Sequence, residues 1–162
     1  MMLDDAITTP YSSFTMKIAI VYGSTTGKTQ AVATLLQGHF PGSVVLNVAH
    51  IQARDLTEFE VVLLGTSTWA TGALQNDWLR RLPLFPPGCL KGKNLAFFGL
   101  GDKVAFPDTF CHGMHTLQRH FAPGAVRVLG GEGLSLDDDN HHLLTEGRVA
   151  GWADKLKEEG LG

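Results

Sequence analysis

Hydroxyl-bearing residues gather in one short segment, YGSTTGKT, which directly follows an apolar run near the start of the chain. Its end, Gly27-Lys28-Thr29, matches the end of the loop that binds nucleoside triphosphates. That loop also needs a glycine where this chain has Tyr22, and Gly23 stands too close to Gly27 to replace it. The spacing therefore disfavours a nucleotide hydrolase, an alternative that tight binding of ATP–Mg²⁺ would restore.

The same segment suits a phosphate group that is held without a side-chain cation. Its small residues allow main-chain N–H groups to surround an anion, and the helix that follows adds its positive end. The hydroxyls of Ser24, Thr26 and Thr29 can complete the coordination. A tight strand-to-helix turn without a ligand explains the segment equally well.

Two later segments place an aromatic residue beside small ones. In TSTWATG, Trp69 can stack on a planar ligand, although a tryptophan folded over the sheet edge as core is the alternative. In GLGDKVAF, Gly99 and Gly101 let the main chain approach a ligand closely, and Phe106 offers a second aromatic face. The dinucleotide-binding pattern is absent there, because its last glycine or alanine falls on Val104.

The elements that must position these segments are short strands alternating with amphipathic helices. Strands are expected in the apolar runs 17–22, 43–48, 60–65, 94–99 and 125–129. Helices are expected over 31–40, 74–82 and 110–121, and after Thr145, which would act as N-cap. This order predicts an α/β fold with right-handed crossovers, in which all three segments meet at the carboxyl edge of a parallel sheet.

Composition narrows the class of protein. Hydrophobic residues make up 44% and charged residues 18% of the 162 residues, which fits a single domain, expected over 16–162. Residues 1–15 read as a flexible extension and lack the pattern of a signal or transit peptide. The net charge of -3 disfavours nucleic acid and anionic membranes as partners. Two cysteines, Cys89 and Cys111, suit a reducing, cytoplasmic location.

Taken together, the three segments resemble the cofactor loops of flavodoxin, a small FMN-binding electron carrier, and the resemblance covers residues 17–158. Ser24-x-Thr26-Gly27-x-Thr29 resembles the phosphate loop of that family, and Thr68-Trp69-x-x-Gly72 its first flavin loop. Gly101-Asp102, together with Phe106 and Phe110-Cys111, resembles its second flavin loop.

The resemblance implies a three-layer sandwich with a five-stranded parallel sheet of order 2-1-3-4-5 and helices on both faces. It implies non-covalently bound FMN whose ring lies between Trp69 and Phe106, with no catalytic residue and no metal. The partners it implies are redox proteins, namely a flavodoxin reductase or other donor and an acceptor enzyme, which meet a monomer. The residues expected to bind FMN are Ser24, Thr25, Thr26, Gly27, Lys28, Thr29, Thr68, Trp69, Ala70, Thr71, Gly72, Leu100, Gly101, Asp102, Phe106, Cys111 and Asp139.

Several positions depart from the family pattern. Phe106 stands where tyrosine is customary, Lys103 where a neutral or acidic residue is commoner, and Gly130–Gly133 leaves no room for the inserted loop of longer members. In the family, the peptide that matches Ala70–Thr71 turns its carbonyl toward the flavin N5–H. Because Ala70 has a Cβ atom, we expect it to resist the positive φ that a glycine would accept.

Two alternatives remain from the sequence. A flavodoxin-like NAD(P)H-dependent quinone reductase would share the architecture, and a flavin-free interaction module would share the fold alone. A small buried hydrophobe explains Cys111 equally well. His112 and His115 fall on the polar side of the expected helix, so we expect solvated side chains there and not a metal site.

Overall fold

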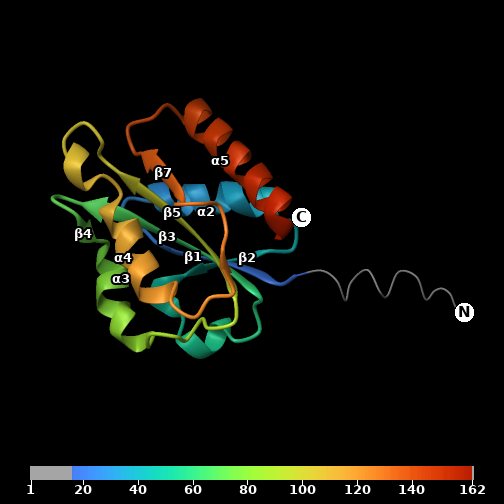
Figure 1. The fold of residues 1–162 in the computed structure, drawn as a ribbon. Coiled ribbons are helices and arrows are strands. Elements are labelled where there is room, and N and C mark those ends of the chain that lie inside the picture. The colour runs from blue at the N-terminus through green and yellow to red at the C-terminus, as the bar shows by residue number, and fades with distance from the viewer. Residues whose placement is uncertain (1–15, 162) are drawn as a thin grey trace, which may run out of the picture.

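A parallel sheet forms the middle layer of the computed structural model, which describes residues 16–161. The expected extension at 1–15 lies outside the described residues. Four strands lie side by side in the order β2-β1-β3-β5 (Figure 1). Their bounds are β1 Ile18–Gly23, β2 Val44–Asn47, β3 Val61–Trp69 and β5 Asn94–Gly101.

Two short strands share the fifth position of the sheet. β6, Arg127–Val128, pairs with the start of β5, and β7, Leu134–Asp137, pairs with its end. A glycine-rich turn separates them, closed by a hydrogen bond of 3.1 Å from Gly133 N to Gly130 O. The expected order 2-1-3-4-5 is confirmed, while the single fifth strand expected at 125–129 is wrong. A further two-residue strand, β4, Ala73–Leu74, pairs antiparallel with the end of β3.

Helices cover both faces of the sheet (Figure 1). α2, Lys28–His39, and α5, His142–Leu156, pack on one face, and α3, Asn76–Arg81, and α4, His112–Phe121, pack on the other. Short 3-10 turns lie at Val48–His50, Ala53–Leu56, Leu82–Leu84 and Pro107–Thr109, and a π turn at Lys157–Leu161 follows α5.

The start of α5 differs from the expectation. Thr145 lies inside the helix, so the expected N-cap at Thr145 is wrong. The helix instead begins at His142, because Nδ1 of His141 accepts a hydrogen bond of 3.2 Å from Leu143 N and so acts as the cap.

The central strands are apolar on both faces, which explains why their sequences do not alternate. Along β1, Ile18 and Ile20 belong to the core under α2 and α5, while Ala19 and Val21 belong to the core under α3 and α4. Trp78 and Trp152 are packing residues, 0% and 6% exposed. Between residues 16 and 161, no helix is long and apolar enough to cross a membrane.

Candidate functional site

The phosphate-loop segment connects the end of β1 to the start of α2. Gly27 caps the helix with φ of 91°, a left-handed conformation that favours glycine, and its N–H donates to Ser24 Oγ at 3.0 Å. The first main-chain N–H groups of any helix lack intrahelical acceptors. Among the residues that the structure describes, no side chain accepts a hydrogen bond from these groups at the start of α2. The amides at the start of α2 are therefore free to bind an anion. Thr29 is 1% exposed and lies beneath them.

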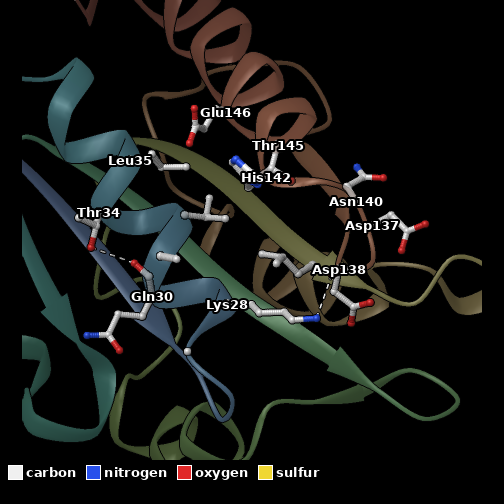
Figure 2. Close-up of a pocket in the computed structure, with 14 residues that line it drawn as sticks. Lys28, Gln30, Thr34, Leu35, Asp137, Asp138, Asn140, His142, Thr145 and Glu146 are labelled. Carbon is white, nitrogen blue, oxygen red and sulfur yellow. Dashed lines mark hydrogen bonds between the residues drawn. The ribbon is translucent and has the colours of Figure 1, made fainter.

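Lys28 does not turn toward the amides of its own loop. Its Nζ donates to the main-chain oxygen of Asp138, which lies in the loop that follows β7, at 3.0 Å (Figure 2). This contact ties the first loop to the last one.

The second segment ends β3 and presents Trp69 at the surface. The Trp69 side chain is 41% exposed, and its Nε1–H donates to Ser67 Oγ at 2.9 Å. Thr68 Oγ1 accepts from Gly113 N at 2.9 Å, which joins this segment to the start of α4. A Cβ atom at Gly113 would lie only 3.0 Å from Ser67 O, so glycine favours the close approach of α4 there.

The turn after Trp69 corrects one expectation. Ala70 has φ of 46°, so its Cβ atom does not keep it out of the left-handed region, contrary to the expectation. The turn is closed by a hydrogen bond of 3.1 Å from Gly72 N to Trp69 O, and Gly72 has φ of 113°. Antiparallel pairing of Trp69 with Ala73 narrows the hairpin and holds Ala70 in the left-handed region. Thr71 is exposed in the same turn.

The third segment folds back over the end of β5. A Cβ atom at Gly101 would lie 3.0 Å from Cys111 N, so glycine allows the loop to return this closely. Asp102 organises the loop, because its Oδ1 accepts from Ala105 N at 2.9 Å and its main-chain oxygen accepts from Phe106 N at 3.0 Å. The Phe106 side chain is half-buried. Lys103 lies at the rim, with Nζ 5.7 Å from the centre of the Phe110 ring.

A small cavity of about 150 Å³ joins these segments at the carboxyl edge of the sheet. It opens beside a wider cavity of about 590 Å³ between α2 and α5, where Leu35 lies opposite His142 and Thr145 (Figure 2). Ten of the residues expected to bind FMN line neither cavity, namely Ser24, Thr25, Ala70, Thr71, Gly72, Gly101, Asp102, Phe106, Cys111 and Asp139. The small cavity is lined by Thr26, Lys28, Thr29, Ser67, Thr68, Trp69, Leu100 and Asp138.

Acidic side chains surround the same edge. The carboxylates of Asp102, Asp137 and Asp139 lie within 4.8 Å of one another. Burial raises the pKa of Asp138, with Lys28 acting in the opposite direction and the neighbouring aspartates adding to the rise. The edge therefore carries a negative field, which disfavours the addition of further negative charge nearby.

Cys111 lies in the interior behind the third segment. Its side chain is 0% exposed, its φ is 57°, and its Sγ lies 3.8 Å from Leu136 O. Burial raises the pKa of the Cys111 thiol to about 11, so the group stays protonated near neutral pH. These features favour its reading as a packing residue.

Sequence reasoning missed three residues that hold the site together. Ser67 positions the Trp69 indole, Gly113 holds Thr68, and Gln75 donates to Thr25 Oγ1 at 3.2 Å. Ser67 belongs to the TSTWATG segment, but only the fold shows which group its hydroxyl bonds. The contact between Gln75 and Thr25 spans 50 positions, and no local pattern indicates it.

Comparison with known proteins places these loops in context. The sequence matches the model of the flavodoxin family over residues 20–152. A flavodoxin of Nostoc sp. (strain PCC 7120) is 30% identical over 164 aligned positions, which cover 88% of this chain and 96% of the relative. Flavodoxin 1 of Escherichia coli K12 is 28% identical, over an alignment that covers 86% of this chain and 92% of the relative.

A solved structure gives the same result in three dimensions. The crystal structure of a Fusobacterium nucleatum flavodoxin mutant, bound to flavin mononucleotide, superposes with a TM-score of 0.80 at 25% sequence identity. The match covers 91% of this chain and 98% of that one.

Proposed function

The chain belongs to the flavodoxin family, and from that premise we propose that it holds one FMN at the carboxyl edge of the sheet and carries electrons between redox proteins. It is an electron carrier and not an enzyme. FMN supplies the electron-carrying chemistry when it is bound, and the protein tunes that chemistry through dipoles, charges and apolar walls.

The single observation that carries the proposal is the shared cavity. Thr29 after β1, Thr68 and Trp69 at the end of β3, and Leu100 in β5 all line it. These positions are far apart in the sequence and come together only at the carboxyl edge, where ligands bind in open parallel sheets. A ligand with an anionic end and a planar end matches this arrangement.

The residues at the first loop fit a phosphate. Free amides at the start of α2 and the hydroxyls of Ser24, Thr25, Thr26 and Thr29 form a donor set suited to an anion. With the Lys28 amine bonded to Asp138 O, these neutral donors would hold the phosphate. The glycine cap at Gly27 leaves the space above the amides open, since a Cβ atom built there meets nothing within 4 Å.

The residues at the second and third loops fit the ring. Trp69 is exposed enough to stack on a planar group, while Ser67 limits its rotation. We place the ring between Trp69 and Phe106, with Ala70, Thr71 and Gly72 beside it on one side and Gly101 on the other. The aspartates behind this edge make further negative charge on the ring costly, which lowers the reduction potential.

Partners are redox proteins in general. We propose a reductase or other donor and an acceptor that approach a monomer of this chain at the Trp69 edge and form small, transient interfaces. Opposite charge on the partner would steer the approach toward the aspartates at this edge.

The absorbance spectrum of the purified protein tests the proposal. We expect a flavin spectrum, one FMN released per chain on denaturation, and no oxidation of NAD(P)H unless a separate reductase is added. A colourless protein that takes up no FMN at micromolar concentrations would contradict flavin binding. NAD(P)H oxidation without a reductase would contradict the role as a carrier.

A further inference from the structure

Gln75 is a buried polar side chain directly beside the site. It follows Leu74 of β4 and precedes α3, and it is 1% exposed. Glutamine is mostly found at protein surfaces, and burying a primary amide is unfavourable unless its donors and acceptor are all bonded. The position of this amide therefore needs an explanation.

Every polar atom of the Gln75 side chain has a partner. Oε1 accepts from Trp78 N at 3.1 Å and caps α3. Nε2 donates to Asp77 Oδ2 at 3.0 Å and to Thr25 Oγ1 at 3.2 Å. The first two contacts are local to α3. The third reaches an exposed residue of the phosphate loop, so a buried amide holds a loop that otherwise faces solvent.

The end of β1 leaves space for the Gln75 amide because Gly23 has no side chain. A Cβ atom at Gly23 would lie 2.4 Å from Gln75 Oε1 and 2.6 Å from Trp78 Cδ1, so only glycine allows both side chains to lie against the main chain here. Trp78 is in turn fixed to β3, because its Nε1–H donates to Gly65 O at 2.8 Å. Gln75 therefore stands on a rigid support that spans β1, β3 and α3.

We propose that Gln75 is a positioning residue for phosphate binding, acting through Thr25 on the loop that presents the amides at the start of α2. The inference rests on the proposed FMN function. A loop that is already ordered loses less conformational entropy when it binds an anion, so the contact strengthens phosphate binding without touching the ligand. Its effect should be confined to the phosphate end.

Two flavins separate a positioning role from a general structural one. The test uses the full chain stripped of flavin and titrated with FMN or with riboflavin, which lacks the phosphate, while flavin fluorescence is followed. For Gln75→Leu we expect the Kd for FMN to rise about tenfold, as the loss of one ordering hydrogen bond implies. We expect the Kd for riboflavin to change by less than about twofold.

Two further variants complete the experiment. Thr25→Val removes the acceptor, and the double variant Gln75→Leu/Thr25→Val should bind FMN as weakly as Thr25→Val alone, because the proposal has Gln75 act on the phosphate only through Thr25. Phe59→Leu, in the core far from the loop, controls for lost stability and should leave the ratio of the FMN and riboflavin Kd values unchanged.

The outcomes are distinguishable. If Gln75→Leu weakens both flavins equally, or if the two substitutions add fully, Gln75 has no specific role at the phosphate and the inference is overturned. If the wild-type protein binds FMN but the ratio of the FMN and riboflavin Kd values is unchanged in Gln75→Leu, the inference is overturned and the proposed function is not. Wild-type protein that binds neither flavin overturns the proposed function as well.

Discussion

The two ends of the proposed FMN site are built differently. At the phosphate end, the loop 23–29 is supported from beneath by Gln75 and Trp78, which are 1% and 0% exposed. At the ring end, Trp69 is 41% and Val104 82% exposed. The phosphate end presents main-chain amides on a rigid support, whereas the ring end presents side chains to solvent.

This difference follows from what each end does. An anion is held well by fixed dipoles that need no rearrangement, so rigid amides suit the phosphate. An electron carrier must let partners approach its ring, so the ring end stays exposed and forms only small interfaces. Substitutions at the phosphate end should therefore act on stability and FMN affinity together, and those at the ring end should change stability less.

The largest effect is expected at the support of the phosphate end. Gly23→Ala puts a Cβ atom within 2.6 Å of the buried Trp78 ring, so we expect a loss of about 3 kcal/mol in the free energy of unfolding. Urea denaturation of the flavin-free protein measures this loss in the free energy of unfolding. Gly38→Ala, inside α2 with nothing within 4 Å of the added atom, is the control and should not destabilise. Equal stability of Gly23→Ala and wild type would refute the rigid support.

A smaller effect, on binding alone, is expected at the ring end. Trp69→Ala removes the exposed stacking face, so affinity for both FMN and riboflavin should fall by about 2 kcal/mol. Fluorescence titrations measure both affinities, and the free energy of unfolding of the flavin-free protein should change little. Leu79→Ala, at an exposed leucine on α3, serves as control. Loss of FMN affinity with riboflavin affinity intact would contradict the assignment of Trp69 to the ring.

A glycine substitution in the turn at Ala70 should raise the stability of the protein instead of lowering it. Because φ is 46°, Ala70→Gly relieves left-handed strain, and we expect about 0.5–1 kcal/mol of added stability after the greater freedom of glycine in the unfolded chain is subtracted. Ala105→Gly, also exposed, has no positive φ to relieve and should destabilise. Thermal unfolding of both variants makes the comparison, and loss of stability in Ala70→Gly would show that the turn is unstrained.

The smallest effect concerns charge at the rim. Lys103 is exposed and lies over Phe110, so Lys103→Gln should lower the reduction potential of bound FMN by about 20 mV at low ionic strength and by less in salt. Potentiometric titration measures the shift, with Lys91→Gln, remote from the site, as control. A higher potential in Lys103→Gln, or the same shift in Lys91→Gln, would contradict an effect at the ring.

The sequence was sufficient for those features that depend on local patterns. The apolar runs predicted the four central strands, and the order of the three loops predicted the family. β3 continues past the predicted end at residue 65 to Trp69, because its next two residues still pair with β5 and its last two pair with β4, which the apolar run does not reveal. The fifth strand is split because the run Gly130–Gly133 forms a tight turn.

Features set by distant contacts escaped prediction. Ala70 takes a positive φ because a hairpin closes around it, which residue preference alone argues against. Gln75 reaches Thr25 only after β1 and β4 have come together. In this chain, the residues proposed to touch the ligand follow recognisable patterns, while the residues that hold them in place do not.

The amide NMR spectrum of ¹⁵N-labelled, flavin-free protein tests the central claim most directly. We expect inorganic phosphate to shift the amides of residues 24–29, riboflavin to shift the Trp69 indole, and FMN to shift both. Shifts that instead cluster on the exposed surface of α3, around Leu79, would contradict the site described here.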